Sequence, residues 1–228
     1  PDCVLETTED AIAFFERNLW PVGIAWLAGH GGYSHRNAET VLRRHVGVCF
    51  DACHFSVQFE QLDRSLETLT RHGIRVSKVQ ISAALKTRMS GDGARRLEAF
   101  VDPVYLHQAR ILDAGGRKRR YDDLTPEFLR EWADAEAGCE CRIHFHVPLY
   151  MMEHDGIAST ADDLTPAFLL TAARFGVRHF EIETYTFDVL PPALRRATVE
   201  SSLADEYGWA LERFAQAASG NVEKEKTA

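Results

Sequence analysis

An acid and a histidine in this chain stand at a spacing that could hold a divalent cation. Asp51 follows the short apolar run of residues 46–50, and His54 comes three positions later. A carboxylate at the end of a strand and an imidazole in the turn after it can both reach one ion. The spacing therefore predicts a metal site, although an acid that follows a strand is also a common helix cap.

Three later apolar segments carry polar side chains at alternate positions. Because successive side chains of a strand point to opposite faces, residues two apart share a face. The three polar sets are Lys78, Gln80 and Ser82 in residues 76–82, Arg142, His144 and His146 in residues 142–149, and Glu181, Glu183 and Tyr185 in residues 179–186. Acids in an otherwise apolar strand need partners or a wet cavity, so this pattern indicates a site rather than a plain core.

These side chains predict a metal centre with a small-molecule site beside it. We expect the metal ligands to be Asp51, His54, His146 and Glu183, with Glu183 and His54 also acting in catalysis. The substrate contacts are expected to be Gln80, Lys78, His144, Glu181 and Tyr185. Such a mixture of carboxylates and imidazoles suits Mn²⁺, Mg²⁺ or Zn²⁺. The alternative is that the two strand histidines are hydrogen-bonded core residues.

Helical periodicity separates these segments. Apolar residues at every third or fourth position predict helices over residues 8–20, 38–45, 59–72, 94–101, 125–137, 163–175 and 199–218, with Pro21 ending the first. Helices alternating with strands favour a parallel sheet joined by helical crossovers. Since the strands carry polar groups on one face, we expect an α/β barrel whose polar face lines the lumen, rather than an open doubly wound sheet.

Two segments fall outside this repeat. Residues 106–121 are expected to form an inserted hairpin, because Ala-Gly-Gly lies between two extended runs. The polar tail of residues 219–228 is expected to be disordered. The chain would then be a single α/β-barrel domain over residues 1–218.

Composition and charge exclude several classes of function. The formal net charge of −8 opposes a nucleic-acid surface. No run approaches the roughly 18 apolar residues of a membrane span, and the N-terminus lacks the pattern of a signal peptide. Five cysteines, an odd number, do not resemble the framework of a secreted scaffold, so we expect reduced, structural cysteines. The composition therefore predicts a soluble, cytoplasmic protein that binds neither nucleic acid nor membrane.

Five segments carry a resemblance to a known family. They are residues 48–54, 78–82, 102–108, 144–148 and 181–191. On these segments the chain resembles the xylose isomerase-like TIM barrel superfamily, which includes sugar isomerases, ketose epimerases and endonuclease-IV-type repair enzymes. Within that superfamily it looks most like the metabolite traffic protein EboE group.

The resemblance implies a TIM (β/α)8 barrel with a metal at the ends of its strands, and Asp51, His54 and Glu183 match the recurring ligand positions. Sugar epimerases usually have a histidine where this chain has Gln80, and the superfamily's acid on the fourth strand has no counterpart here. By this comparison the chain holds about strands five to eight with the inserted hairpin, and the N-terminal half of the barrel is missing. Two exposed strand edges would then favour a homo-oligomer or aggregation.

The resemblance also implies a function. We expect a metal-dependent sugar isomerase- or epimerase-like protein involved in the processing or traffic of a small metabolite in bacteria, with a sugar-like or hydroxy-carbonyl substrate. Glu183 and the missing fourth-strand acid would transfer a proton between adjacent carbons. Two alternatives stay open. One is a non-catalytic small-molecule binding protein on the same fold, which Gln80 favours, and the other is a phosphodiester-cleaving enzyme, which the negative charge opposes.

Overall fold

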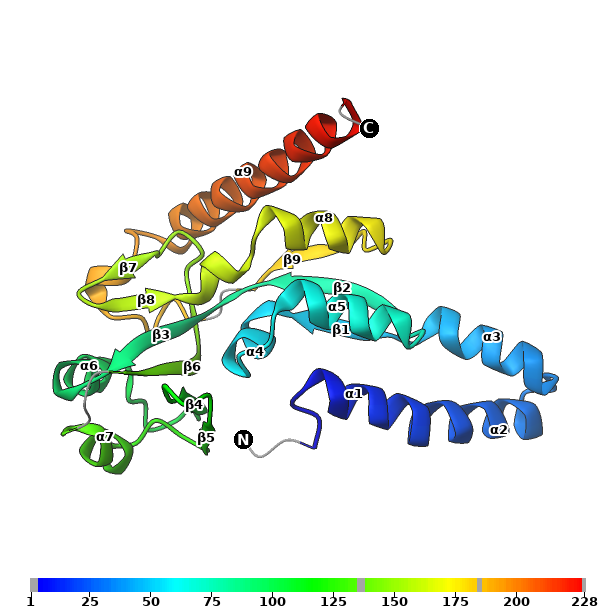
Figure 1. Ribbon diagram of the computed structural model, residues 1–228, viewed down its shortest axis with the longest axis horizontal. Helices are drawn as coiled ribbons and strands as arrows, with labels where there is room; N and C mark the ends of the chain where they lie inside the picture. Colours follow the sequence, from blue (N-terminus) through cyan, green and yellow to red (C-terminus); the bar gives the residue numbers. More distant parts are fainter. Residues whose placement is uncertain (1–3, 135–137, 184–185, 227–228) are drawn as a thin grey trace.

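The computed structural model describes residues 4–134, 138–183 and 186–226, and in these ranges the fold is mixed α/β with two separate sheets (Figure 1). The first sheet has three parallel strands in the order β1-β2-β9. The second has six antiparallel strands in the order β5-β4-β6-β3-β8-β7. The predicted α/β class is confirmed, but neither sheet closes on itself, so the described residues do not form a barrel.

The parallel sheet consists of β1 (Val48–Asp51), β2 (Val76–Ile81) and β9 (Phe180–Ile182). One face of it is apolar and packs under helices, where the ring centroid of Phe50 lies 5.6 Å from that of Phe168. The other face carries the polar side chains, which pair with one another across neighbouring strands. The prediction that alternate residues share a face is therefore confirmed for these strands.

Three helices cover the apolar face, namely α5 (Leu62–Arg71), α8 (Pro166–Arg174) and α9 (Val199–Lys226) (Figure 1). Helix α9 continues past residue 218, where the sequence pattern predicts its end. Glu and Lys are good helix formers, so polarity alone does not end a helix. None of the helices in the described ranges combines the length and the apolar character that a membrane crossing requires.

The largest departure from the predicted fold is β3 (Ala83–Met89). It follows β2 directly and carries the chain from the first sheet into the second (Figure 1). β6 (Cys139–Val147) pairs antiparallel with β3, and Ala84 lies opposite His146. The prediction that residues 142–149 form one of the parallel strands is therefore wrong, because β3 offers the backbone of β6 an antiparallel partner that the sequence pattern does not reveal.

The predicted hairpin is confirmed as β4 (Ala109–Leu112) and β5 (Lys118–Tyr121). Its turn includes Gly116 at a φ of 79°, a conformation that favours glycine. Because β4 also pairs with β6, the hairpin is an integral part of the second sheet. The short strands β7 (Glu153–His154) and β8 (Ile157–Ser159) complete that sheet beside β3.

Helices α6 (Gly91–Leu97) and α7 (Pro126–Trp132) pack against each other beside the second sheet (Figure 1). The predicted Thr-Pro helix starts are confirmed, because the hydroxyl oxygens of Thr125 and Thr165 accept the N–H of the residue three positions on, at 3.2 and 3.1 Å. Three short 3-10 turns are Glu98–Phe100, Thr160–Asp163 and Pro192–Leu194.

The first helix does not end at Pro21 as predicted. α1 (Thr8–Phe14) passes through a π-helical turn (Phe15–Leu19) into α2 (Trp20–His30). A proline inside a helix lacks an N–H and its ring crowds the carbonyl group one turn earlier. The wider π turn before Pro21 accommodates the missing hydrogen bond, so the helix continues past this residue.

Helix α3 (His35–His45) folds back beside α2 (Figure 1). Gly23 allows the two helices to approach closely, because a Cβ atom at this position would lie 2.8 Å from Cδ2 of Leu42. One continuous cluster of buried apolar side chains then joins residues of both sheets and of their helices.

Candidate metal centre and adjoining pocket

Asp51 is both a helix cap and a candidate metal ligand. It ends β1 and precedes the short helix α4 (Ala52–Val57), which the sequence pattern does not reveal. Its Oδ1 accepts hydrogen bonds from the Cys53 N–H, at 3.0 Å, and from the Ser82 hydroxyl. Its Oδ2 lies 3.4 Å from Nε2 of His54. The two interpretations of Asp51 are therefore compatible, because each uses a different carboxylate oxygen.

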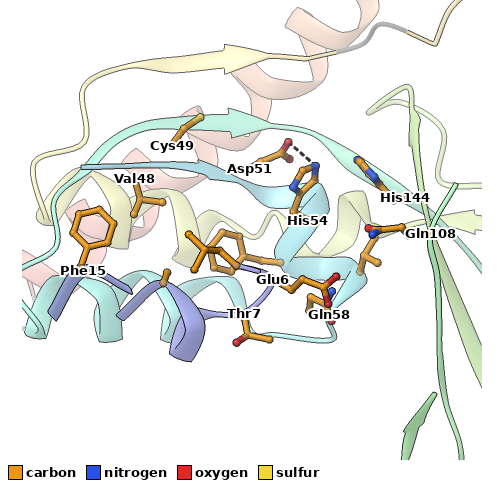
Figure 2. Close-up of a pocket in the computed structure, with 14 residues that line it drawn as sticks. Glu6, Thr7, Phe15, Val48, Cys49, Asp51, His54, Gln58, Gln108 and His144 are labelled. Atoms are coloured by element: carbon orange, nitrogen blue, oxygen red, sulfur yellow. Dashed lines mark ion pairs between the residues drawn. The ribbon is translucent and has the colours of Figure 1, made fainter. Parts of the chain in front are cut away.

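Three histidines gather beside Asp51 from two elements. His54 projects from α4, whereas His144 and His146 share one face of β6, as the alternating pattern predicts. The ring centroids of His54 and His144 lie 4.3 Å apart (Figure 2). The donor atoms of Asp51, His54 and His146 all lie within 4.8 Å of one another. The structure thus brings three of the predicted metal ligands together.

The end of β9 orients His146. Its Nδ1 lies 3.2 Å from the backbone oxygen of Glu183. A carbonyl oxygen can only accept, so Nδ1 donates, and Nε2 is the ring nitrogen that can offer a lone pair. The hydroxyl of Thr186 also donates to the backbone oxygen of His146. Metal-binding imidazoles are commonly oriented by a carbonyl group in this way.

Glu183, the fourth predicted ligand, brings a second carboxyl group to Asp51. It lies just past β9, where its N–H donates to the backbone oxygen of Ile81 at 3.4 Å. Its Oε2 is buried and receives no hydrogen bond from the described residues. Two adjoining carboxyl groups repel each other unless a proton or a cation lies between them.

The two carboxyl groups have pKa values that shift in opposite directions. Burial and the negative charge of Asp51 raise the pKa of Glu183. Burial also acts to raise the pKa of Asp51, but His54, His146 and the hydrogen bond from Ser82 outweigh it, so that pKa lies below its usual value. As the pH rises, Asp51 is therefore the first of the pair to ionise.

The chemistry of these groups fits a bound cation. Burial, together with His54 and His146, lowers the pKa of His144 to about 3, so this ring is neutral and can offer a lone pair. Its Nε2 is buried and has no hydrogen-bond partner among the described residues. Buried polar atoms are rarely left unpaired. Asp51, with these imidazoles and a second carboxyl group beside it, could therefore hold a divalent ion.

Three of the predicted substrate contacts form their side-chain hydrogen bonds outside this cluster. Lys78 donates to the Glu181 carboxylate on the polar face of the parallel sheet, where both side chains are partly exposed. Gln80 accepts a hydrogen bond from the Cys49 thiol at 3.1 Å. The described residues that line the pocket beside the metal ligands include none of the three, and Tyr185 lies outside the described residues.

A pocket of about 460 Å³ lies beside Asp51 and His54, between α1, β1 and α4 (Figure 2). Its polar lining includes Asp51, His54, His144 and Gln108, together with Glu6, Thr7 and Gln58. Its apolar wall consists of Leu5, Ala11, Phe15, Val48, Phe55 and Val57. The predicted substrate contact His144 therefore faces the pocket, and most of the remaining surface is carbon.

The sequence pattern does not reveal Glu6, Phe15 or Gln108 as parts of this site. They reach it from distant segments, and the N-terminal segment is held in place where Glu6 accepts from Arg110 at 3.1 Å, across 104 residues of sequence. No local pattern encodes such a contact.

Acid is expected to destabilise the protein through His107, whose side chain is 4% exposed. Burial lowers its pKa from the usual 6.5, although Asp102 and Asp123 act against the shift. The folded state then binds this proton less readily than the unfolded state, so the stability is present above about pH 6.5 and is lost as the pH falls. Urea unfolding between about pH 7 and about pH 5 should show a shallower pH dependence for His107→Gln, by up to ~1.4 kcal/mol per pH unit. The exposed His45→Gln is the control, and equal slopes for wild type and His107→Gln would contradict the assignment.

The chain matches no protein-family model, no curated protein and no solved structure. The resemblance to the xylose isomerase-like superfamily therefore stays a prediction.

Proposed function

We propose that this protein is a divalent-metal-dependent enzyme with isomerase- or epimerase-like chemistry, which acts on a small hydroxy-carbonyl compound in the processing or traffic of a bacterial metabolite. One observation carries the proposal: the donor atoms of Asp51, His54 and His146 lie within 4.8 Å of one another, beside the Glu183 carboxyl group and a pocket. Carboxylate and imidazole donors suit Mn²⁺, Mg²⁺ or Zn²⁺.

We also propose that the parallel sheet is an arc of a xylose isomerase-like TIM barrel. Its support is the combination of parallel strands, helices on the apolar face and polar side chains on the other face. β1 and β9 each have an edge to which the described residues add no strand. Such edges could pair with further barrel strands, and they also favour self-association into a homo-oligomer.

Asp51, His54 and His146 would hold the ion. The Ser82 hydroxyl orients the carboxylate and the Glu183 backbone oxygen orients the imidazole of His146, so two ligands are fixed before the ion binds. A bound divalent ion would polarise a carbonyl oxygen and hold a neighbouring hydroxyl group. His54, whose side chain is 55% exposed, lies at the open side of the cluster and would orient a substrate oxygen.

Glu183 is the group that we assign to proton transfer. Burial and Asp51 raise its pKa, which brings it closer to the range where a side chain both accepts and returns a proton near neutral pH. It would remove a proton from the carbon next to the carbonyl group and return it to the same or the neighbouring carbon. This is the step that isomerisation and epimerisation share.

The pocket narrows the substrate class. Among the described residues that line it, none is a lysine or an arginine, so no side chain of this kind would pair with a phosphate group. Its carbon-rich wall favours a compound with an apolar part next to its hydroxy-carbonyl group, rather than a sugar phosphate. The same lining and the net charge of −8 disfavour cleavage of a phosphodiester.

A non-catalytic small-molecule binding protein on the same fold is the second candidate. It is favoured by the polar face of the parallel sheet, where Lys78 pairs with Glu181, and Gln80 with Cys49. Lys78, Glu181 and Gln80 are engaged in these pairs and are not among the described residues that line the pocket, whereas Cys49 is. A protein that binds metal and ligand without moving a proton would retain this arrangement.

Exchange of substrate hydrogen with deuterated buffer tests the proposal. The substrate is an α-hydroxyketone that carries an apolar substituent. With Mn²⁺ present, we expect the protein to replace the hydrogen next to its carbonyl group by deuterium from the buffer, which nuclear magnetic resonance measures. Glu183→Gln should lower the exchange rate by about 10²- to 10⁴-fold, because it removes the proton carrier. Glu181→Gln is the matched control, since this glutamate pairs with Lys78 instead of facing Asp51.

Three outcomes decide between the candidates. Exchange that Glu183→Gln removes and Glu181→Gln retains supports the enzyme. Saturable binding of the ketone with no exchange supports the binding protein. Exchange that survives in Glu183→Gln contradicts the role of this residue.

A further inference from the structure

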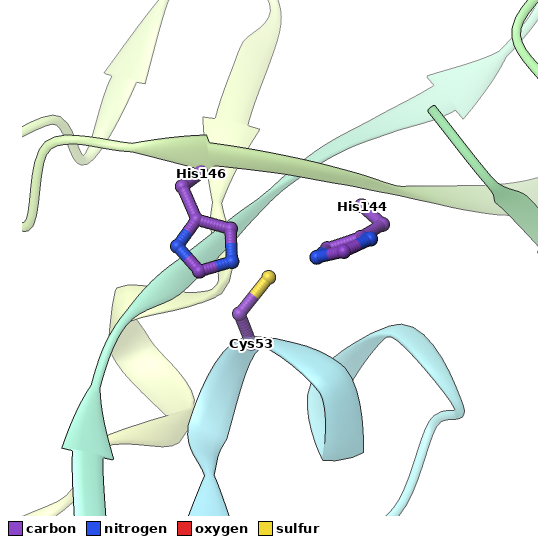
Figure 3. Close-up of side chains that lie close together, drawn as sticks. All are labelled: Cys53, His144 and His146. Carbon is purple, nitrogen blue, oxygen red and sulfur yellow. The ribbon is translucent and has the colours of Figure 1, made fainter. Parts of the chain in front are cut away.

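A second set of donor atoms lies on the buried side of the candidate metal centre. The Sγ of Cys53 and one nitrogen each of His144 and His146 lie within 4.8 Å of one another. Figure 3 shows the thiol of Cys53 rising from α4 between the two imidazole rings of β6. Cys53 and His146 are 0% and 1% exposed, so two of the three donors are shut away from solvent.

Two features of the backbone place these side chains. The N–H of Cys53 donates to Asp51 Oδ1 and to Ser82 Oγ, at 3.0 and 2.9 Å, which fixes the first turn of α4. His144 and His146 are two apart on β6 and so share the face that packs on this turn. The three donors therefore converge because of local geometry on each element and the packing of α4 on β6.

Both imidazoles can offer a lone pair to an ion that also binds the Cys53 sulfur. His146 donates through Nδ1 to the Glu183 backbone oxygen, which puts its lone pair on Nε2. Nε2 of His144 is buried and has no hydrogen-bond partner among the described residues. A buried imidazole nitrogen without a hydrogen bond is a feature that metal binding explains.

We propose that Cys53, His144 and His146 form a thiolate-imidazole site for a thiophilic divalent ion such as Zn²⁺. Thiolate and imidazole are both zinc ligands, and three protein ligands leave a further position for water or another ligand. On binding, the Cys53 thiol loses one proton to solvent and its sulfur donates an electron pair to the ion. This site is formed by the placement of the three residues, and it could bind an ion whether or not the protein catalyses the proposed reaction.

The two ligand sets share His146, so they cannot both hold an ion at the same time. Nε2 has one lone pair, so His146 can bind only one ion at a time. The set with Asp51 and His54 is rich in oxygen and nitrogen and suits Mn²⁺, whereas the set with Cys53 suits Zn²⁺. Zn²⁺ in the sulfur-containing site would therefore displace Mn²⁺ from the other.

Cobalt titration of the whole chain tests the proposal. Co²⁺ substitutes for Zn²⁺ and gives a near-ultraviolet sulfur-to-cobalt charge-transfer band when a thiolate binds it. We expect the band in the wild type, its removal by one equivalent of Zn²⁺, and its loss in Cys53→Ser. Cys141→Ser is the matched control, because Cys141 is also a fully buried free thiol but lies on the opposite face of β6 from His144 and His146.

Affinity gives a second readout. We expect Cys53→Ser to weaken Zn²⁺ binding by more than the ~10- to 100-fold that loss of an outer partner costs, and to leave Mn²⁺ binding unchanged. X-ray absorption of the Zn²⁺-loaded wild type should show a sulfur neighbour at about 2.3 Å, and this measurement needs no variant to fold.

The alternative is that Cys53 is only a packing group, since its side chain also contacts Val57 and Ala84. A wild type without the charge-transfer band, or a band that survives in Cys53→Ser, would establish that alternative. Asp51→Asn separates this proposal from the proposed function, because it should remove Mn²⁺ binding and keep the sulfur-to-cobalt band. If Asp51→Asn leaves Mn²⁺ binding intact while Cys53→Ser loses the band, the proposed function fails and this site stands.

Discussion

Asp51→Asn should lower the affinity of the protein for Mn²⁺ by more than about 100-fold, because it removes the one carboxylate that the surrounding groups keep ionised. The asparagine oxygen can still accept from Cys53 N–H, so α4 retains its cap and the fold should survive. What is lost is the negative charge that offsets the ion. Isothermal titration calorimetry of the metal-free protein with Mn²⁺ measures the change.

The control for this experiment is Glu181→Gln. It removes a carboxylate from the same polar face of the parallel sheet, but one that pairs with Lys78 outside the metal cluster. We expect Mn²⁺ affinity to be retained in this variant. Equal losses in Asp51→Asn and Glu181→Gln would mean that the ion responds only to the general charge of the face.

Glu6→Gln should destabilise the protein by about 3 to 5 kcal/mol, because it leaves the guanidinium group of Arg110 buried without its counter-ion. The side chain of Arg110 is 1% exposed and that of Glu6 is 10% exposed, and Nη2 contacts both carboxylate oxygens at 3.1 Å. The remaining hydrogen bonds from Arg110 to the backbone oxygens of Ala109 and Tyr121 do not neutralise its charge. Urea unfolding measures the free energy of unfolding.

Glu127→Gln is the matched control for Glu6→Gln. Glu127 pairs with Arg130 at 2.5 Å, but both side chains are more than two-thirds exposed. Exposed ion pairs contribute only about 0–1 kcal/mol, so this variant should unfold nearly as the wild type does. A change of similar small size in both variants would show that burial does not strengthen the pair of Glu6 with Arg110.

The ion pair of Glu6 with Arg110 also matters for the candidate site. Glu6 lines the pocket, and the pair joins the segment before α1 to β4. In the Glu6→Gln variant we therefore expect the N-terminal wall of the pocket to loosen before the rest of the molecule unfolds. The pocket next to the metal ligands thus depends on a contact far from those ligands in the sequence.

The sequence by itself determined which side chains share a face. Alternation placed His144 and His146 on one side of β6, and it separated Phe50 from Asp51 in β1. It also determined several local features, namely the hairpin turn and the Thr-Pro helix starts. These properties follow from backbone geometry over a few residues, so a short stretch of sequence is enough to encode them.

Only the tertiary structure decided which strands pair and in which direction. β6 has the predicted face pattern, yet it is antiparallel to β3 rather than parallel in the first sheet. Alternation has the same period in both directions, so it carries no information about the partner strand. The extra strand β3 determines the partner and direction of β6, through backbone hydrogen bonds between residues about 60 apart in the sequence.

The same distinction applies to the site. Asp51 and His54 were visible as a motif because they are only three positions apart. Their association with His146 survives the change of topology because the ends of β6 and β9 still meet. The place of Cys53 between two imidazoles follows from the packing of α4 on β6. Local spacing determines which groups are available, whereas the contacts that bring them within reach of one ion depend on strand pairing and helix packing across the whole chain.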